Sequence, residues 1–538
     1  MNSPKSRFPR FPSYGGRQRR GPPGAWRRGV AAMMAAALLA APLPGGVAQA
    51  QAQRLPDLQD ESGGLLSAQT ERRIGETYYR QLRGEPDYLD DPEVTAYVEE
   101  LGARLIAASE NPSMDVEFFM IRDNSINAFA MIGGYIGVNS GLLIAAQSES
   151  EVASVLGHEI GHLIQKHLAR AISANQKTSM MSMIGAAFCL LAARSHPDAI
   201  GACAMAAGAV PISEQLRYSR DFEREADRVG FDILKKGGFD VSAMPVFFER
   251  LDRAGRAYEG NIPVYVRSHP LTVERIADVR NRVQATPYRQ HADPLAFHLV
   301  RAKLRATLAT TVDTRAEALR FFAVQLKEQT YANLAAAHYG HAWAMLQNRD
   351  AAGAEAEFAK IPKPLAHPMF ENLAASIKLA RGDAAGAVNT LRAAVARYPQ
   401  QRYLQLALID ALQQAKRHDE ALALLREQVQ RYRSDPRLYT MQVKSFGATG
   451  KRMSQHQAQA EYNVLVGRYQ PAIDELMVAR CAGDGDFYQQ SIIDARIRGV
   501  WELMLDAQRD QNGGKESNPD RPRKPMPQGK APEARCNS

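Results

Sequence analysis

Two histidines, His158 and His162, stand four residues apart, with Glu159 directly after the first of them. Residues four apart on a helix lie on the same face, so both imidazoles can reach one metal ion. Two neutral imidazoles suit Zn²⁺, and a catalytic zinc site needs a third protein ligand and an open position for water. Glu159 projects beside the pair and can act on that water as a general base. The spacing therefore predicts a zinc-dependent hydrolytic centre with one ion per subunit.

The third ligand must come from elsewhere, because no further histidine follows at a spacing that would bring it to the same ion. His167 lies five residues after His162 and, on one continuous helix, faces another direction. Glu223 and Asp227 are again four residues apart, on a second predicted helix. One carboxylate can bind the metal while the other accepts a hydrogen bond from a ligating imidazole. A solvated acidic face, with Glu223 paired to Arg220, explains the same spacing, so spacing alone leaves both interpretations open.

The histidine pair lies on a helix that we expect to run from residue 149 to about 174. Ser148 is a suitable N-cap, and Glu151 stands at the position of its capping-box partner. The helix carries Gly157 and Gly161, each of which costs about 1 kcal/mol relative to alanine in a helix interior. That cost predicts a neighbouring element packed closely against this helix.

Three strand-like runs precede the helix, at residues 116–121, 126–131 and 135–138. Gly133 and Gly134 form a turn signal between the last two runs. We therefore expect a small β-sheet beside the metal site. One of its strands can pair with an extended peptide, which gives main-chain affinity with little side-chain selectivity.

The formal charge of +9 is concentrated at the two ends of the chain. Residues 1–50 carry eight Lys/Arg and no Asp/Glu, and residues 511–538 carry six Lys/Arg against three Asp/Glu. Residues 51–510 therefore have a net charge of −2. A nucleic-acid-binding domain usually carries its own basic face, so we expect no nucleic-acid partner.

The first fifty residues have the order of an export signal. A basic region ends at Arg28, an apolar run follows over 30–41, and small residues stand at Ala48 and Ala50. This order predicts a secretory signal peptide, 1–50, that is removed after export. An uncleaved anchor is the alternative, although the apolar run is shorter than the about 20 residues of a membrane span.

Residues 179–212 are unusually apolar, but Arg194, His196 and Asp198 interrupt the run. The uninterrupted stretch is too short to span a bilayer. We interpret the segment as a buried or lid-forming helical hairpin. The alternative is an element that touches a membrane, which predicts peripheral membrane contact.

From residue 291 to about 508 the pattern is helical and repeats internally. Ala354, Ala387 and Ala421 stand 33 and 34 residues apart within similar segments. This period resembles the tetratricopeptide repeat, a helix-turn-helix unit of about 34 residues; an Ala-rich bundle with chance similarity is the alternative. We expect an all-α repeat domain over 291–508, followed by a polar, disordered tail at 509–538.

Taken together, these features resemble the M48 family of zinc metallopeptidases over about residues 60–505. The matching motifs are Asn127-Ala128-Phe129-Ala130, Gly133-Gly134, Gly157-His158-Glu159-Ile160-Gly161-His162, Glu223-Arg224-Glu225-Ala226-Asp227 and Ser268-His269-Pro270-Leu271. The resemblance implies an α+β fold, in which a mostly helical, zincin-like peptidase domain with a small β-sheet occupies 51–290 and the all-α tetratricopeptide-repeat domain follows. It also implies that Glu223 is the third zinc ligand and Asp227 its hydrogen-bonding neighbour.

His269 is a candidate that the residues alone leave open, since a loop histidine often has no special role. In M48 relatives the His-Pro loop lies near the metal. The resemblance therefore implies one of two roles for His269. It is either catalytic, stabilising the tetrahedral oxyanion, or regulatory, occupying the open metal position and holding the enzyme idle. Arg275 is a further candidate for contact with the oxyanion.

Together with the export signal and the repeats, the resemblance implies a periplasmic zinc endopeptidase. Its expected substrates are unfolded or misassembled outer-membrane proteins, which it would degrade in envelope quality control. Its expected partner, bound through the repeat domain, is the outer-membrane β-barrel assembly machinery. The alternative is a chaperone or scaffold for outer-membrane protein assembly in which proteolysis is latent.

Overall fold

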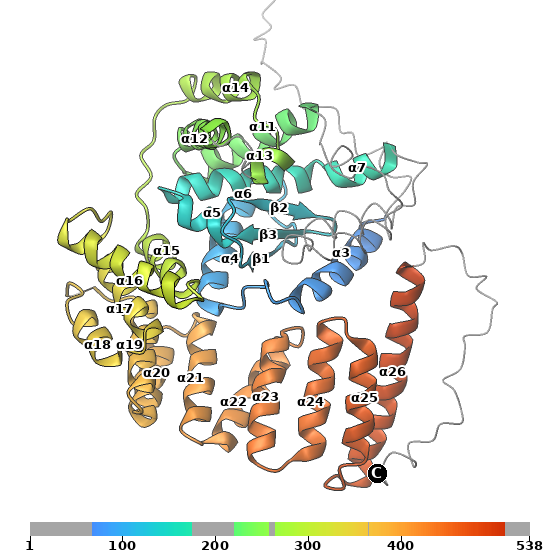
Figure 1. Ribbon diagram of the computed structural model, residues 1–538. Coiled ribbons are helices and arrows are strands. Elements are labelled where there is room, and N and C mark those ends of the chain that lie inside the picture. The colour runs from blue at the N-terminus through green and yellow to red at the C-terminus, as the bar shows by residue number, and fades with distance from the viewer. Residues whose placement is uncertain (1–66, 175–219, 258–263, 364, 512–538) are drawn as a thin grey trace, which may run out of the picture. The chain divides into compact units, whose positions relative to one another are not determined.

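This computed structural model describes residues 67–174, 220–257, 264–363 and 365–511 (Figure 1). The expected signal peptide, the apolar segment 179–212 and most of the expected tail lie outside these ranges. Within them, no helix combines the length and the apolar character needed to cross a membrane.

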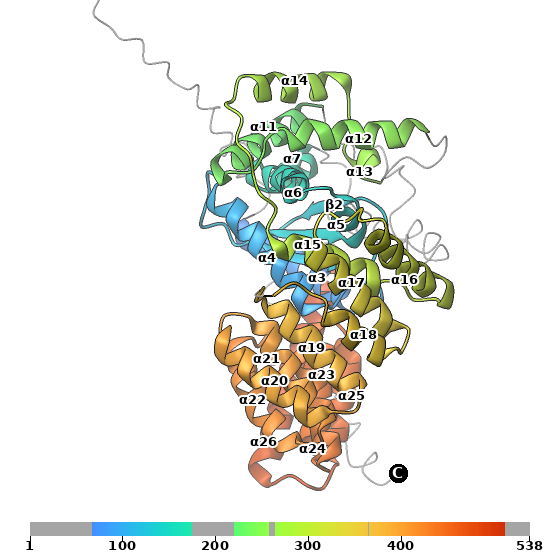
Figure 2. The same cartoon turned by 90° about the vertical axis from the view of Figure 1, so that its left-hand side faces the viewer.

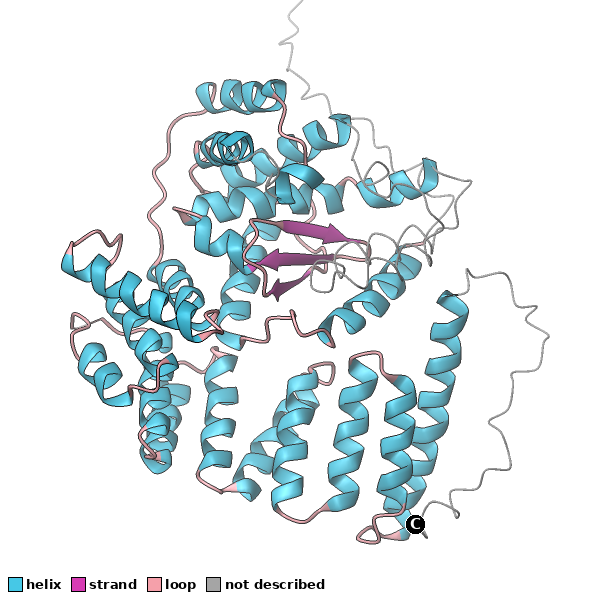
Figure 3. Ribbon diagram, in the orientation of Figure 1, coloured by secondary structure: helices cyan, strands magenta, loops and turns pink. Residues whose placement is uncertain are grey.

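The N-terminal part of the described chain has one small sheet among helices (Figure 3). The strands are β1 (Glu117–Ile121), β2 (Ala128–Met131) and β3 (Tyr135–Asn139). The helices are α3 (Ala68–Arg83), α4 (Pro92–Ala107), α5 (Ser140–Ala145), α6 (Glu149–Ile164), α7 (His167–Ala174), α11 (Arg220–Gly237), α12 (Ala243–Ala257), α13 (Val264–Ser268) and α14 (Val273–Gln284).

Strand β3 lies in the middle of the sheet, whose order is β1-β3-β2. It pairs in parallel with β1 and antiparallel with β2, so in the described part of the chain one edge of β2 has no strand beside it. The three expected strands are confirmed. The turn between β2 and β3 contains Gly133 and Gly134, with φ of 83° and 86°. A side chain on Gly133 would meet the Glu71 carbonyl oxygen at 2.5 Å, which explains the glycine there.

Helix α6 packs on β2, and α11 and α12 pack on α6. Figures 1 and 2 show α11, α12 and α13 gathered on the side of α6 that is turned away from the sheet. With neighbours on both sides, α6 is buried at every position from Glu149 to His162. The histidine pair therefore lies in the interior of the protein.

Helix α6 starts where the sequence predicts and ends earlier. The Ser148 hydroxyl caps it by accepting a hydrogen bond from the Glu151 amide at 3.3 Å. The capping box expected for Glu151 is wrong, because its carboxylate accepts from the Gln147 amide at 2.7 Å and pairs with Arg250. One helix to residue 174 is also wrong. Lys166 adopts a left-handed conformation, with φ of 50°, which separates α6 from α7.

The described chain from Leu295 onward is built of helices. They are α15 (Leu295–Thr307), α16 (Val312–Lys327), α17 (Leu334–Gln347), α18 (Ala351–Phe358), α19 (Pro368–Ala380), α20 (Ala384–Arg397), α21 (Arg402–Gln414), α22 (His418–Arg431), α23 (Pro436–Ala448), α24 (Arg452–Leu465), α25 (Tyr469–Arg480) and α26 (Phe487–Gln511). The Asp350 carboxylate caps α18 by accepting from the Gly353 amide at 2.8 Å, and Asp383 caps α20 through Gly386 at 2.7 Å. The repeated Asp-Ala-Ala-Gly sequence thus starts a helix in each of two successive units. The expected α+β fold class is confirmed.

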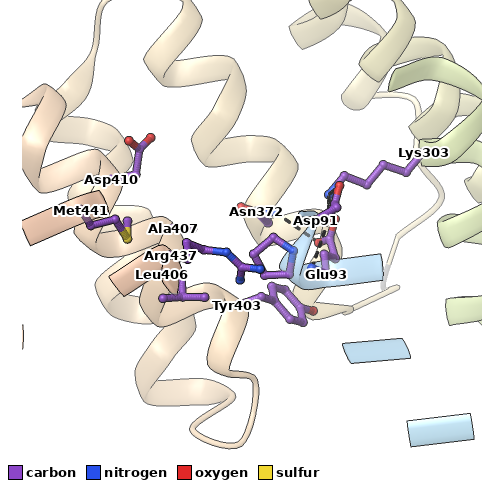
Figure 4. A pocket seen from close by; sticks show the side chains of 11 residues that line it. Asp91, Glu93, Lys303, Asn372, Tyr403, Leu406, Ala407, Asp410, Arg437 and Met441 are labelled. Atoms are coloured by element: carbon purple, nitrogen blue, oxygen red, sulfur yellow. Dashed lines mark hydrogen bonds and ion pairs between the residues drawn. The ribbon is translucent and has the colours of Figure 1, made fainter. Parts of the chain in front are cut away.

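Lys303 of α15 connects the helices of the C-terminal part to the start of α4. Its Nζ lies 2.8 Å from Asp91 Oδ2 and 2.7 Å from Glu93 Oε2, and Glu93 also accepts from the Tyr339 hydroxyl at 3.2 Å. Figure 4 shows these charged groups at the wall of a pocket of about 220 Å³. The rest of its lining is Pro92, Asn372, Tyr403, Leu406, Ala407, Asp410, Arg437 and Met441. Because Lys303 and Glu93 are buried, the contact depends on each charge keeping its partner.

We expect Lys303→Met to lower the free energy of unfolding by about 3–5 kcal/mol, the usual cost of leaving a buried charge without its partner. Urea titrations followed by circular dichroism measure the change. Lys444→Met is the matched control, because the ammonium of Lys444 lies 3.2 Å from Asp410 in an exposed pair and such pairs contribute about 0–1 kcal/mol. Equal effects of the two substitutions would contradict the buried ion cluster.

Candidate metal centre

Helices α6 and α11 approach closely because small residues face each other across their contact. A Cβ atom on Gly157 would lie 3.3 Å from the Gly230 carbonyl oxygen, and one on Gly161 would lie 2.9 Å from that of Ala226. The close neighbour that the two α6 glycines predict is therefore α11, and this prediction is confirmed. The approach brings the carboxylates of α11 against the histidine pair of α6.

Replacing Gly230 by alanine tests this contact. The added methyl group would lie 2.9 Å from the His158 backbone nitrogen, so α11 has to shift away from α6. We expect the free energy of unfolding to fall by about 1–3 kcal/mol, as is typical of overpacking, in urea titrations. Gly499→Ala is the control, because nothing lies within 4 Å of its added methyl and alanine favours a helix by about 1 kcal/mol. A neutral Gly230→Ala variant would contradict the close packing.

Four buried side chains from three parts of the chain converge beside this contact. His158 and His162 of α6 bring their Nε2 atoms to 3.0 Å from each other. The Glu223 carboxylate of α11 lies 3.4 Å from His158 Nε2 and 3.5 Å from His162 Nε2. His269 follows α13 and completes the group, in which ligand atoms of all four residues lie within 4.8 Å of one another. The structure thus brings together residues that the sequence singles out separately.

This donor set fits zinc in chemistry and in spacing. Tetrahedral zinc holds nitrogen and oxygen ligands at about 2.0–2.2 Å, which places neighbouring ligand atoms about 3.3–3.6 Å apart. The separations of 3.0–3.5 Å among His158, His162 and Glu223 are close to that range. Both imidazoles are at most 3% exposed, so a cation held between their facing nitrogens would satisfy both lone pairs.

The surrounding carboxylates stabilise positive charge at this place. Burial alone would lower the pKa of His158, but hydrogen bonds to Asp227 and Glu223 outweigh it and raise the pKa to about 9. Burial and the neighbouring charge of His158 hold the pKa of His162 well below its usual range. The group therefore favours one positive charge among its nitrogens. A metal ion bound there would supply that positive charge.

Asp227 and Arg275 contact the group from outside. Asp227 Oδ1 lies 2.9 Å from His158 Nδ1, so the imidazole turns Nε2 toward the other ligands. Arg275 donates to both oxygens of Asp227 at 2.7 Å and lies 2.8 Å from Glu223 Oε2. Burial alone would raise the pKa of Asp227, but the Arg275 charge outweighs it and lowers the pKa. These contacts give Arg275 a structural role at the two carboxylates, while its contact with the oxyanion stays a prediction.

His167 joins the site although the sequence places it on another face. Because the chain turns at Lys166, His167 Nδ1 lies 2.8 Å from His162 Nδ1. Its Nε2 lies 2.9 Å from Glu225 Oε2, and its ring stacks on Phe222 with centroids 4.5 Å apart. Burial lowers the pKa of His167 to about 4, so the ring is neutral and orients His162 through a hydrogen bond. Only the helix break reveals this partner, and no spacing rule locates the break.

Glu159 lies between the ligands and the sheet. Its Oε2 accepts a hydrogen bond from the Ala130 amide on β2 at 3.0 Å, and its Oε1 lies 3.5 Å from His269 Nε2. Burial raises the pKa of Glu159. A proton is therefore held more firmly here than on an exposed glutamate, which suits a group that takes up and returns a proton near neutral pH.

His269 points into the ligand group. Its Nδ1 lies 3.0 Å from Glu223 Oε1 and 3.4 Å from His158 Nε2. Its backbone amide donates to the Tyr265 carbonyl at 2.7 Å, which ties it to α13. We name this arrangement, with His269 beside the other ligand atoms, the closed state.

Two regions of the chain match known protein families. Residues 92–283, which contain every residue of the site, match Peptidase family M48, and residues 378–444 match the tetratricopeptide repeat. The beta-barrel assembly-enhancing protease of Escherichia coli (strain K12) is 32% identical over 481 residues, which are 88% of this chain and 96% of that protein. A relative from Vibrio cholerae is 41% identical over 271 residues, 50% of this chain and 56% of its own length. The mitochondrial metalloendopeptidase OMA1 of Schizosaccharomyces pombe is 27% identical over 220 residues, 40% of this chain and 61% of that protein.

Proposed function

The chain belongs to peptidase family M48, and on that premise we propose that its metalloendopeptidase site holds one zinc ion per subunit. His158, His162 and Glu223 are the proposed ligands, Glu159 is the proposed general base, and Asp227 orients His158. The observation that carries the proposal is the convergence of these buried nitrogen and carboxylate groups within 4.8 Å, with His269 as the fourth member.

Each side chain of the site has a task in peptide hydrolysis. Held by His158, His162 and Glu223, a zinc ion would supply a Lewis acid for the scissile carbonyl and for a water molecule. Glu159 takes the proton of that water on its carboxylate and returns it to the leaving amine. Asp227, held by Arg275 at 2.7 Å, keeps His158 in one orientation throughout. An extended substrate is expected along the outer edge of β2, which has no strand beside it among the described residues and where backbone groups bind peptides of many sequences.

Of the two roles that the sequence leaves open for His269, we assign the regulatory one. In the closed state its imidazole lies 3.0 Å from Glu223 and 3.4 Å from His158. A substrate carbonyl or water needs the same side of the ligand group. Proteolysis then requires His269 to leave, so the activity is latent until a substrate or partner moves the segment that follows α13.

We further propose where the protein works and what it contacts. The relatives named beta-barrel assembly-enhancing protease support a protease role in outer-membrane assembly. The proposed course is export to the periplasm with 1–50 as the cleaved signal peptide, followed by degradation of misfolded or stalled outer-membrane proteins by the peptidase domain, 51–290. Helical repeats stack into extended binding surfaces, so the repeat domain, 291–508, is the proposed contact for the outer-membrane assembly machinery.

Metal analysis of Glu223→Ala beside the wild type tests the ligand set. We expect the wild type, loaded with zinc and dialysed, to keep one ion per subunit. The variant should bind zinc at least about 10–100-fold more weakly. That is the usual loss of metal affinity when a residue that only hydrogen-bonds to a ligand is removed. Asp232→Ala, exposed on the same helix, is the control and should keep its zinc. Full occupancy in a folded Glu223→Ala protein would remove Glu223 from the ligand set.

A further inference from the structure

Tyr265 of α13 carries a buried hydroxyl group that the closed state does not use. Its side chain is fully buried, and its phenol oxygen has no hydrogen-bond partner among the described residues. Buried hydroxyl groups nearly always have a partner, and leaving one without a partner costs free energy. Phenylalanine would fill the same space without that cost. A substrate atom that accepts a hydrogen bond from this hydroxyl would remove that cost.

The Tyr265 side chain lies at the reacting part of the site. Its ring centroid is 4.8 Å from that of His269 and 6.2 Å from that of His158. Burial, and after it the negative charges of Glu159, Glu223 and Asp227, raise the pKa of the phenol well above its usual range, although the Arg275 charge acts in the opposite direction. The phenol is therefore a neutral hydrogen-bond donor among the groups of the metal centre.

The backbone fixes Tyr265 from both sides. Its amide donates to the Ile126 carbonyl at 3.3 Å, two residues before β2, and its own carbonyl accepts from the His269 amide at 2.7 Å. Tyr265 thus lies between the segment that leads into the substrate-binding edge strand and the residue that closes the site. When His269 leaves the ligand group, the space that opens is bordered by the Tyr265 ring.

We propose that Tyr265 is a catalytic residue whose phenol donates a hydrogen bond to the scissile carbonyl oxygen as that oxygen becomes negatively charged. The inference rests on the proposed peptidase function. Donors aimed at such an oxygen stabilise the transition state more than the bound substrate. No proton is transferred from the phenol, since Glu159 is the group that accepts and returns the proton. Arg275 is held at Asp227 and Glu223, which leaves Tyr265 as the donor on the His269 side of the group.

Tyr265→Phe in full-length protein tests the role of the hydroxyl, because it removes one oxygen and keeps the ring. It is made in the wild type and in His269→Ala, so that an effect on the closed state is separated from an effect on the reaction. With a quenched fluorescent peptide as substrate, kcat should fall about 100-fold in both backgrounds, as for the loss of one oxyanion donor. KM and zinc content should stay unchanged. The melting temperature should stay unchanged or rise.

A second measurement does not depend on turnover. A phosphinic peptide mimics the tetrahedral oxyanion, and calorimetry should show that Tyr265→Phe weakens its binding by a factor close to the loss in kcat. The matched control is Tyr339→Phe, which removes an equally buried hydroxyl that donates to Glu93 at 3.2 Å. That variant should lose stability and keep kcat and phosphinic-peptide affinity.

The outcomes separate this inference from the proposed function. If the wild type and His269→Ala show no zinc-dependent cleavage, the proposed function fails. If they cleave and Tyr265→Phe cleaves equally well or binds the phosphinic peptide equally well, the catalytic role of Tyr265 is overturned. Loss of zinc or of melting temperature in Tyr265→Phe overturns it too, in favour of a purely structural role.

Discussion

Glu159→Gln is expected to lower kcat for peptide hydrolysis by about 10²–10⁴-fold, the usual contribution of a general acid–base group. Glutamine keeps the length of the side chain and an oxygen that can accept the hydrogen bond from the Ala130 amide. It cannot take a proton from the attacking water or return one to the leaving amine. Zinc content and KM should therefore stay close to those of the wild type.

Steady-state kinetics with a quenched fluorescent peptide and metal analysis on the same samples measure this effect. Glu427→Gln, an exposed position on α22, is the matched substitution and should change neither quantity. A variant that retains more than about one tenth of the wild-type kcat would show that Glu159 is not the general base, because the loss would be smaller than any general base contributes.

The same variant separates the protease from the scaffold. The two functions place different demands on Glu159, since binding a stalled outer-membrane protein requires no proton transfer. If cells that carry Glu159→Gln assemble outer-membrane proteins as well as wild-type cells, the scaffold function is the primary one. If assembly fails while the protein stays folded and zinc-loaded, proteolysis is the activity that assembly needs.

The parts of the site that the sequence predicts are those governed by helix periodicity. His158 with His162, and Glu223 with Asp227, are pairs at a spacing of four residues, and each pair lies on one face of its own helix. Gly161 adds that another element packs closely against the first helix. These features are local, so the residues alone indicate the histidine pair and its close neighbour. For Glu223 and Asp227 the spacing leaves a solvated acidic face equally open, and only the resemblance to family M48 implies the ligand role.

Other features depend on how the elements pack. His167 reaches His162 only because Lys166 adopts a left-handed conformation. A positive φ is uncommon for lysine, so the sequence does not indicate it. Tyr265 is a single aromatic residue with no partner in sequence. Arg275 contacts Asp227 because α14 lies beside α11. No spacing rule brings separate elements together, so only the folded structure shows what these three residues contact.

The fold divides in the same way. The repeats are visible in the sequence because similar segments recur 33 and 34 residues apart. Two of these segments also carry a helix start signal, such as Asp383 capping α20 through Gly386. The order β1-β3-β2 is not visible, because alternation of apolar residues locates strands without saying which strands pair. The contact of Lys303 with Asp91 and Glu93 also escapes sequence analysis, since it joins residues from two parts of the chain.

His269→Ala is expected to raise basal proteolysis by about 10–100-fold. In the closed state the imidazole lies 3.0 Å from Glu223, 3.4 Å from His158 and 3.5 Å from Glu159, so it contacts two proposed ligands and the general base together. If the closed state outweighs the open one by about 10–100 to 1, only that fraction of molecules accepts substrate, and removing the imidazole raises kcat/KM by the same factor. The gain should appear with a short peptide that cannot itself displace His269.

If activity does not rise in His269→Ala, the zinc content of the variant distinguishes a ligand role of His269 from an oxyanion role. If His269 were an indispensable ligand, His269→Ala would lose both zinc and activity. If His269 instead stabilised the oxyanion, zinc would stay and kcat would fall, and Tyr265→Phe would then act on the same step. His298→Ala, a half-buried histidine on α15, should change neither quantity. Only an increase in kcat/KM with zinc retained fits the regulatory role, because only then does the imidazole compete with substrate for an intact metal site.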